Sequence, residues 1–289
     1  KGTYLTKDVS EEDISNLMVG REISFEYDKE EVKLGEEVLR VENLKYVDKF
    51  KIPKLSGVSF KVSRGEIVGV AGVEGNGQSE MISIITGNMP AIDGKVFLNG
   101  HDITRESITN IRKLGMSHVP EDRMLDGCAP EMSVQENLTV SNIDSFANKT
   151  GMIQKSKIKE FCKNQIVEFN VKTKDENQSI GSLSGGNIQK VIVAREFKAN
   201  SDLLILNQPT RGVDVGAISF IHSKILEMRS DNKAILLVSA DLNELISLSD
   251  RIIVMHKGKI AGILSNAPKV TEQELGLYML GLKKQEGLG

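Results

Sequence analysis

Hydrophobic and polar positions follow two different periods in the first part of the chain that is expected to fold. Residues 38–44 (VLRVENL) and 57–62 (GVSFKV) alternate apolar and polar positions, which predicts half-exposed strands. Residues 66–72 (EIVGVAG) form a nearly continuous apolar run that ends in glycine, which predicts a strand buried on both faces. A helix is expected over residues 78–86, with Gly87 as its C-terminal stop.

The rest of the chain continues this alternation of strands and helices. Helical spacing predicts helices within residues 131–170 and another helix after Asn187. Apolar runs at 202–206, 234–239 and 251–255 predict three more buried strands, and helices such as AISFIHSKILEM separate them. Strands that alternate with helices indicate a mainly parallel sheet. The all-helical stretch in the middle of the chain indicates an inserted lobe.

Composition and charge exclude several classes of protein. The chain has 289 residues, 39% of them hydrophobic, which is enough for one large domain or for a large domain with a small lobe. The net charge is −3 and no basic run is long enough for a nucleic-acid patch, so no nucleic-acid partner is expected. No apolar run approaches the about 18 residues of a membrane span. Cys128 and Cys162 have no C-x-x-C partner, which argues against a disulfide framework or a zinc site.

Two segments near opposite ends of the chain resemble each other. Residues 6–20 (TKDVSEEDISNLMVG) and 267–281 (APKVTEQELGLYMLG) each combine an acidic start, a Leu/Met face and a closing glycine. Self-similarity at this distance predicts a duplicated domain, with residues 1–20 as the C-terminal tail of a preceding copy. Two unrelated amphipathic helices are the alternative. Residues 21–37 are charged and lack a period, as expected of a linker. Because residue 1 is Lys and not Met, we expect the sequence to belong to a longer polypeptide.

A glycine-rich turn lies between the expected strand 66–72 and the expected helix 78–86. It fits the phosphate-loop pattern G-x-x-x-x-G-K-[ST] in context, spacing and glycines, and its backbone amides would face an anion at the helix start. Gln78 replaces the lysine of the pattern, so it can hydrogen-bond to a phosphate oxygen but cannot neutralise it. Ser79 supplies the hydroxyl expected to bind magnesium, and a purely structural turn is the alternative. The predicted nucleotide-binding residues are Gly72, Gly75, Asn76, Gly77, Gln78, Ser79 and Glu80.

A second glycine motif precedes another expected helix. It reads L-S-G-G-N and comprises Leu183, Ser184, Gly185, Gly186 and Asn187. Two adjacent glycines let backbone amides approach a ligand closely, and a helix N-terminus favours an anion. The serine hydroxyl adds one more donor. The motif therefore predicts a site for a γ-phosphate that is presented from outside the chain.

The buried strand 202–206 ends in two amide side chains. A strand end of this kind usually carries two carboxylates, one that anchors Mg²⁺ and one that orients the attacking water. Asn207 lacks the negative charge that holds Mg²⁺ well, and Gln208 cannot accept a proton. The pattern predicts weak magnesium binding through Ser79 and no intact catalytic base.

In this order and spacing, the three motifs resemble those of the ATP-binding-cassette (ABC) ATPases. The resemblance runs from Val38 to Gly281 and is specific, because LSGGN and the strand-end sequence QPTRGVD occur together. It implies an α/β, P-loop NTPase fold with a RecA-like core, an antiparallel β lobe and an inserted helical signature lobe at about 122–190. It also implies ATP and Mg²⁺ as cofactors, and head-to-tail pairing in which each ATP lies between one cassette's phosphate loop and the other's signature. The cassette is expected over 38–282, with a tail at 283–289.

The resemblance also assigns roles to single residues and shows where the sequence departs from the family. Asp214 matches the aspartate of the D-loop, which reaches across the paired cassettes. Ala240 stands where the family has its switch histidine, and Val119 stands where it has a glutamine. The adenine-stacking aromatic is either Phe50 or Tyr46. No catalytic residue is intact, so little or no ATPase activity is expected of this domain alone. The degenerate positions are Gln78, Asn207, Gln208 and Ala240.

Longer matches narrow the resemblance to importers. The stretch E-D-R-x-x-D-G at residues 121–127 resembles the second cassette of sugar-type tandem importer ATPases. GVEGNGQSE, QPTRGVDVGAI and LLVSADLNELISLSDRI resemble the second cassette of nucleoside importers that work with a basic-membrane-protein-type lipoprotein. This implies a subunit at the cytoplasmic face of the cell membrane. Its partners would be a preceding cassette in the same polypeptide, transmembrane permease subunits and, indirectly, an extracellular substrate-binding lipoprotein. Its intact signature would complete the ATP site of the preceding cassette.

Three other functions stay open at this point. A sugar importer ATPase of the ribose/galactose type differs only in the transported substrate. A soluble ABC protein of DNA repair or translation is disfavoured, since such proteins tend to carry zinc modules, long coiled coils or basic arms. A nucleotide-free scaffold would differ in one simple respect, because nucleotide would not protect it against heat.

Overall fold

The computed structural model describes residues 27, 29, 33–265 and 267–285, and all structural statements refer to these residues. The predicted tail of a preceding domain at 1–20 lies outside them, as do most of the linker 21–37 and residues 286–289. None of the helices in the described part of the chain is long and apolar enough to cross a membrane.

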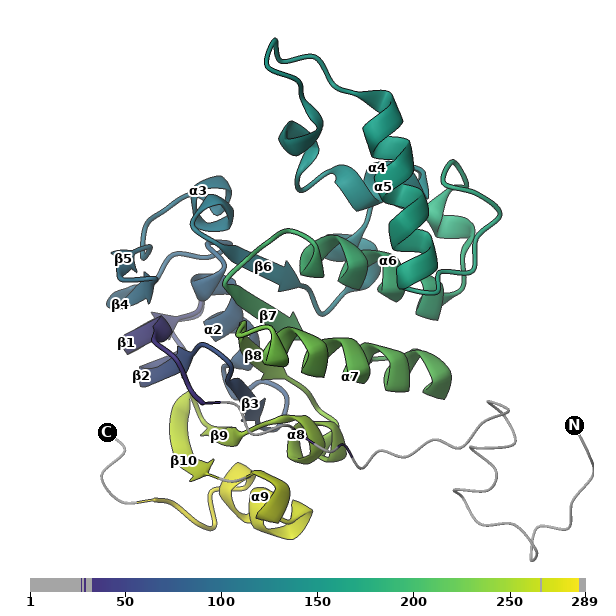
Figure 1. Ribbon diagram of the computed structural model, residues 1–289. Helices are drawn as coiled ribbons and strands as arrows, with labels where there is room; N and C mark the ends of the chain where they lie inside the picture. Colours follow the sequence, from purple (N-terminus) through teal and green to yellow (C-terminus); the bar gives the residue numbers. More distant parts are fainter. Residues whose placement is uncertain (1–26, 28, 30–32, 266, 286–289) are drawn as a thin grey trace, which may run out of the picture.

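A six-stranded sheet forms the centre of the molecule (Figure 1). Across the sheet, the strands are β10 (Lys259–Ser265), β9 (Arg251–His256), β3 (Ile67–Ala71), β8 (Ala234–Val238), β7 (Leu203–Asn207) and β6 (Met116–Val119). Neighbours run parallel except for β10 against β9, so the predicted mainly parallel sheet is confirmed. Every residue of β3, β7 and β8 is buried, as their continuous apolar runs require.

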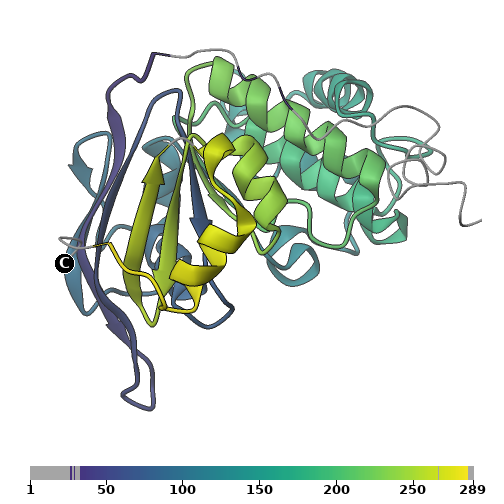
Figure 2. The same ribbon diagram turned by 90° about the horizontal axis from the view of Figure 1, so that it is seen from below.

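A smaller antiparallel sheet packs beside the central one. Its strands, in order, are β2 (Pro53–Ser63), β1 (Glu37–Val47), β4 (Asp93–Leu98) and β5 (His101–Asp102). Buried and exposed positions alternate along much of β1 and β2, as the sequence period predicted. The hairpin of these two strands extends beyond the rest of the molecule (Figure 2).

The central sheet separates two hydrophobic cores. Ile67 and Ala71 point into a core shared with the helices α6 to α9, whereas Val68 and Val70 point into a core shared with α2, α3 and the antiparallel sheet. Figure 2 shows the helices α7 to α9 and the antiparallel strands on opposite sides of the central sheet. The helices are α2 (Gln78–Ile85), α3 (Ile108–Lys113), α6 (Gly185–Phe197), α7 (Val215–Ser230), α8 (Leu242–Leu248) and α9 (Glu272–Met279). The helix expected over 78–86 is therefore confirmed, with Gly87 at φ +80° beyond its end. The sequence did not predict α3, whose six residues are too few to show a period.

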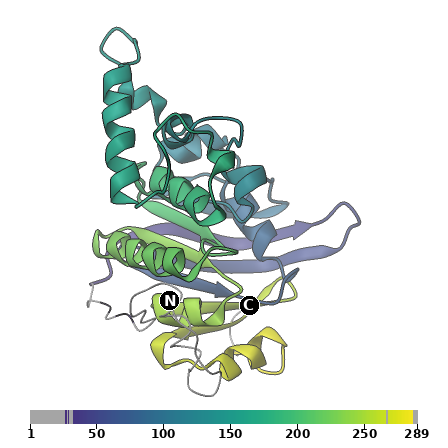
Figure 3. The same cartoon turned by 90° about the vertical axis from the view of Figure 1, so that its right-hand side faces the viewer.

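An inserted helical lobe occupies one end of the molecule (Figure 3). It contains the π-helical turn η2 (Arg123–Gly127), α4 (Val134–Thr139), the 3-10 turns η3 (Ile143–Phe146) and η4 (Ile180–Ser182), and α5 (Lys155–Glu168). A capping box starts α4, because Ser133 accepts from the Glu136 amide while Glu136 accepts from the Ser133 amide. The parallel core, the antiparallel sheet and the helical lobe expected from the sequence are thus all present.

Candidate functional site

The glycine-rich turn connects β3 to α2 and needs its glycines for two different reasons. Gly77 caps α2 at φ +104°, and a Cβ there would lie 2.5 Å from the Lys54 carbonyl oxygen, so a side chain has no room. Gly75, at φ +85°, has open space around its Cβ position and needs only the left-handed conformation. The turn is therefore built partly by close packing against β2 and partly by backbone conformation.

Asn76 fastens this turn to the end of the central sheet. Its Oδ1 accepts from the Lys257 amide at 2.7 Å, and its carbonyl accepts from the Gly258 amide at 3.0 Å. The Gly258 carbonyl in turn accepts from the Ser56 amide at 2.8 Å, which joins the two sheets here. Lys257 and Gly258 form the turn between β9 and the edge strand β10, and the contact of this turn with Asn76 fixes the shape of the phosphate loop.

Gln78 is buried inside the loop rather than directed outward. Its Nε2 donates to the Val73 carbonyl at 3.3 Å, and its amide group lies against Gly72. The first amides of α2 have no acceptor within the helix, and Gly77 offers no side-chain cap. Ser79 is exposed at the helix start, and Glu80 lies in the first turn. The backbone here fits a phosphate chain, although the usual charge-assisted contact of a lysine is replaced by an internal amide contact.

The two amide side chains at the end of β7 interact within the protein, one through burial and the other through a hydrogen bond. Asn207 is only 7% exposed. Gln208 has φ +54°, its backbone amide donates to the Val238 carbonyl at 2.8 Å, and its Oε1 accepts from the Ala240 amide at 3.1 Å. The positions where the family has a catalytic base and a switch histidine therefore contact each other through one hydrogen bond.

The side chains near the phosphate loop do not fit Mg²⁺ well. The cation prefers carboxylates and water, and the strand end offers only a neutral amide beside the Ser79 hydroxyl. Within the described part of the chain, no group of three or more His, Cys, Asp and Glu side chains is arranged to hold a metal. The residues thus fit the phosphates of a nucleotide through backbone amides, and fit its magnesium poorly.

The signature motif forms the start of α6. This helix begins at Gly185, earlier than the sequence predicted, because Ser184 takes the N-cap position with an extended backbone. The Ser184 hydroxyl accepts from Asn187 Nδ2 at 2.8 Å, and Asn187 Oδ1 accepts from the Lys172 amide at 2.8 Å. Ser184 is exposed, and the first amides of the helix have no acceptor within it. The motif therefore places an exposed serine hydroxyl at the start of a helix.

The structure brings the D-loop aspartate beside the signature motif. Asp214 caps α7, with Oδ1 accepting from the Ala217 amide at 3.0 Å. Its other oxygen, Oδ2, would lie 2.8 Å from a Cβ on Gly186, so any larger residue there would displace the Asp214 carboxylate. Figure 1 shows α6 and α7 together, whereas α2 lies elsewhere against the sheet. Two of the predicted site motifs thus form one surface, and the phosphate loop forms another.

A buried polar chain lies behind the end of β7, and sequence reasoning missed it. The Thr210 hydroxyl donates to Glu244 Oε1 at 2.7 Å, and His222 Nε2 lies 2.8 Å from the same oxygen. His222 Nδ1 lies 3.0 Å from the Tyr27 hydroxyl. Burial raises the pKa of Tyr27 to about 12. The chain connects α7, α8 and the linker position Tyr27 to the loop between Gln208 and Asp214, and residues so far apart in sequence carry no common signal.

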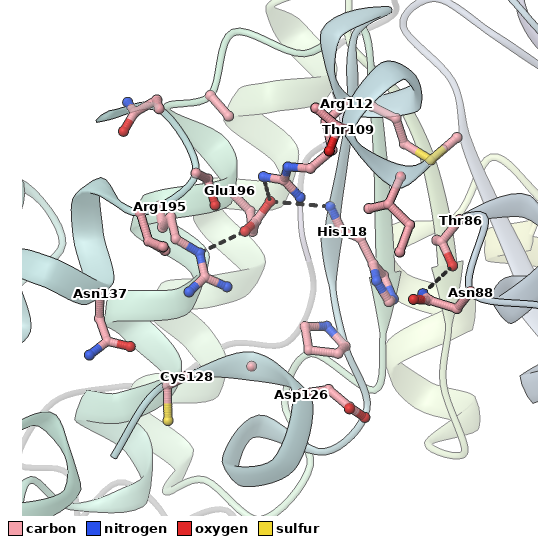
Figure 4. Close-up of a pocket in the computed structure, with 18 of the residues that line it drawn as sticks. Thr86, Asn88, Thr109, Arg112, His118, Asp126, Cys128, Asn137, Arg195 and Glu196 are labelled. Atoms are coloured by element: carbon pink, nitrogen blue, oxygen red, sulfur yellow. Dashed lines mark hydrogen bonds and ion pairs between the residues drawn. The ribbon is translucent and has the colours of Figure 1, made fainter. Parts of the chain in front are cut away.

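A cleft of about 1330 Å³ lies between the β6 end of the central sheet and the helical lobe (Figure 4). Ser79 and Asn207 are among the residues that line it. On its α6 wall, Glu196 is 1% exposed and accepts from Arg112 at 2.8 Å and from Arg195 at 2.7 Å. Burial opposes ionisation of Glu196, but the two guanidinium groups hold its pKa below its usual range.

Burial also lowers the pKa of His118 to about 4, so the ring is neutral at pH 7. Val119, where the family has a glutamine, is fully buried and cannot serve a ligand.

The two candidate aromatics lie in different settings on the β1–β2 hairpin. Tyr46 is half-buried and pairs across the strands with Leu55, whose side chain packs near Gly77. Directly paired residues share one face of a sheet, so Tyr46 lies on the face toward the phosphate loop. Phe50 is 71% exposed near the hairpin tip, where the Lys49 ammonium lies 5.2 Å from its ring centre. Both remain candidates for stacking on adenine.

This chain is similar to known proteins over nearly its whole length. Residues 55–211 match the family model described as "ABC transporter". Guanosine import ATP-binding protein NupO of Bacillus subtilis is 40% identical over 288 residues, which cover 98% of this chain and 56% of that protein. Nucleoside import ATP-binding protein NupA of Lactococcus lactis is 42% identical over 275 residues, which cover 95% of this chain and 54% of that protein. Putative ribose/galactose/methyl galactoside import ATP-binding proteins are also among the relatives. The chain spans about half the length of the curated relatives it matches.

Solved structures agree with the fold. An ATP-binding cassette of an ABC transporter, MJ1267, superposes with a TM-score of 0.71 at 23% identity, covering 86% of this chain and 98% of that one. The α/β ABC cassette fold expected from the motifs is therefore confirmed. The family model spans the phosphate loop, the signature motif and the strand end, which are the three motifs placed above. The chain belongs to the ABC transporter family.

Proposed function

We propose that this chain is the second, C-terminal cassette of a tandem importer ATPase for nucleosides. Its own ATP site would be degenerate, and its signature motif would complete the ATP site of the preceding cassette. The observation that carries the proposal is a contrast within one chain. Ser184 and the glycines of α6 present an intact, outward-facing phosphate site, while the phosphate-loop site lacks a lysine, an acidic magnesium anchor, a base and a switch histidine.

The tandem arrangement rests on two independent facts. The chain covers 56% of its guanosine-import relative and 54% of its nucleoside-import relative, which leaves room in each for a second unit of similar size. Residues 267–281, which include α9, also share a pattern with residues 6–20. We therefore assign residues 1–20 to the end of a preceding cassette, 21–37 to a linker and 38–282 to the present cassette.

The nucleoside assignment rests on relatives whose printed names state guanosine or nucleoside import. A ribose/galactose-type sugar importer is the second candidate, favoured by relatives named for those sugars and by the E-D-R-x-x-D-G stretch at 121–127. The transported substrate would be selected by permease and lipoprotein subunits, so a transport assay is needed to choose between the two.

The permease partners would contact the cleft beside the helical lobe. Its rim carries exposed apolar side chains, among them Ile108, Met132 and Val140. Exposed apolar residues gathered around a groove mark a protein-interaction site. We propose that a segment of one permease subunit is seated here, which would hold the ATPase at the cytoplasmic face of the membrane.

The degenerate site is proposed to bind ATP weakly and with little help from Mg²⁺. The amides at the start of α2 supply the phosphate contacts, with Ser79 as the one hydroxyl toward magnesium. Tyr46 or Phe50 would stack on the adenine. A nucleotide-free scaffold predicts instead that ATP leaves the melting temperature of the chain unchanged, which a thermal shift measurement detects.

The full-length subunit, assembled with its permeases, tests the proposal. Ser184→Arg fills the signature surface with a large cation and is expected to abolish uptake of radiolabelled nucleoside. Gln78→Ala removes at most one neutral hydrogen bond, about 0.5–1.5 kcal/mol, and is expected to have a mild effect. Equal damage by the two substitutions contradicts the assignment of competent and degenerate sites. Competition of uptake by ribose or galactose, but not by guanosine, supports the sugar alternative.

A further inference from the structure

Arg123 connects the helical lobe to the segment that carries the D-loop aspartate. Its Nη1 donates to the Arg211 carbonyl at 2.7 Å, and its Nη2 donates to the Gly212 carbonyl at 3.1 Å. The same Nη2 would lie 2.9 Å from a Cβ on Gly185, so the guanidinium rests directly on the signature motif. One side chain therefore contacts both parts of the surface that faces outward.

The neighbouring residues of the E-D-R-x-x-D-G stretch hold this arginine in place. Asp122 accepts from the Met124 and Leu125 amides at 2.8 and 3.0 Å and caps the π-helical turn η2. These amide contacts hold the pKa of Asp122 below its usual range, although the carboxyl group is exposed. Gly127 closes the turn where a Cβ would lie 2.8 Å from Ile192 of α6. The stretch is thus a compact turn, packed on the signature helix, that directs Arg123 toward the D-loop.

The contacted segment is held at both of its ends by site residues. At one end Gln208 is bonded to the Ala240 amide, and at the other end Asp214 caps α7 beside Gly186. Between these ends the backbone turns through Gly212 at φ +64°. Its carbonyls at 211 and 212 are the acceptors that Arg123 uses. Loss of these two bonds would leave the 211 and 212 carbonyls without their side-chain donor, while the Thr210–Glu244 bond, the Arg211–Glu121 pair and the two ends of the segment stay in place.

We propose that Arg123 is a positioning residue for ATP turnover at the composite site, because it sets the distance between the signature motif and the D-loop. This inference rests on the proposed function. A planar guanidinium suits the task, since its fork reaches two carbonyls at once, whereas the ammonium of a lysine is a single point of charge. The neighbouring Arg211 has a different role, because its side chain forms an ion pair with Glu121 at 2.5 Å. Arg123, Arg211 and Glu121 all line one surface hollow.

Hydrogen–deuterium exchange on this chain tests the structural half of the inference. Arg123→Met is expected to speed amide exchange in 211–214 and at the start of α6 by about tenfold or more, because these segments would open locally more often. Arg123→Lys should give an intermediate rate, and the matched control Arg211→Met should leave both segments within about twofold of the parent. Unchanged exchange in Arg123→Met overturns the inference.

Steady-state kinetics of the full-length transporter test the functional half. Misplacing catalytic groups by about 1 Å costs up to about 100-fold, so kcat for ATP in Arg123→Met is expected to fall at least about tenfold while KM changes little. Partial recovery of kcat by Arg123→Lys is expected, at a temperature where circular dichroism shows all variants folded. A parental kcat in Arg123→Met, measured where Ser184→Arg is inactive, overturns the role of Arg123 and leaves the proposed function standing. An active Ser184→Arg refutes the proposed function and, with it, the functional half of this inference.

Discussion

Two helix N-termini in this chain are built with glycine, at the end of a turn before α2 and in the first residues of α6, yet the side chains around them differ. At α2 the Gln78 side chain is buried and donates to the Val73 carbonyl, and after β7 Gln208 accepts from the Ala240 amide. At α6 Ser184 is exposed and accepts a hydrogen bond from the Asn187 side chain, and the Arg123 guanidinium lies against Gly185. The comparison teaches that the backbone of a phosphate loop can be kept without the charged groups of an active site, because Gly77 is also needed for the close packing of the loop against β2.

The largest expected effect concerns the α2 site on its own. The 289-residue chain is expected to hydrolyse ATP at close to background, far below the turnover of about 1 s⁻¹ at the low end of typical enzymes. Phosphoryl transfer depends on positioning and on charges that stabilise the transition state, and four such groups are absent here. A phosphate-release assay with purified chain measures this. A steady turnover near about 1 s⁻¹ would show that the α2 site is not degenerate.

A matched pair of glycine substitutions sharpens the comparison. Gly186→Val places a branched side chain against Asp214 Oδ2, and is expected to lower ATP turnover of the full-length subunit by about 100-fold through misplacement of the signature. Gly75→Ala meets open space and costs only the left-handed strain, about 1–2 kcal/mol, at the site that we propose to be degenerate. Turnover and melting temperature are measured for both. Greater damage from Gly75→Ala would reverse the roles of the two helix ends.

Restoring the lysine charge at position 78 tests whether the backbone amides at the start of α2 can still bind the phosphates of ATP. Gln78→Lys is expected to tighten ATP binding by about 10- to 100-fold, since a charge-assisted hydrogen bond contributes about 1.5–3 kcal/mol. Binding in the parent chain should be weak and nearly independent of Mg²⁺, because Asn207 carries no charge. Titration calorimetry with and without magnesium measures both. Tight parental binding that disappears on chelation would contradict this account of the site.

The smallest expected effect is a pH dependence of stability from the cleft wall. The folded pKa of His118, about 4, lies below the ordinary value, so the unfolded chain binds the proton first as pH falls. Its contribution to stability is therefore complete above about pH 6.5 and is lost as pH falls toward 4, with a slope of at most about 1.4 kcal/mol per pH unit. His118→Gln should flatten the melting temperature between pH 7 and 5, with the exposed His101→Gln as control. An equally steep decline in His118→Gln would assign the effect to other groups.

Periodicity and motif spacing were sufficient for the single strands and helices, because each depends on residues that are close in sequence, and the alternation of the two along the chain indicated the parallel sheet. The start of α6 was predicted too late, since glycines read as loop until Ser184 is seen to cap them. The chain from Tyr27 through His222 and Glu244 to Thr210 was not predicted, because its members lie on separate elements.

The sequence by itself determined which chemistry is missing, since no fold can give Gln78 or Asn207 a charge. Only the tertiary structure decided where the remaining groups go. It placed Asp214 and Arg123 beside the signature motif, and it brought the Gln208 side chain into a hydrogen bond with the Ala240 amide. The physical reason is that charge and hydrogen-bonding capacity belong to single side chains, whereas contact between them depends on how distant elements pack.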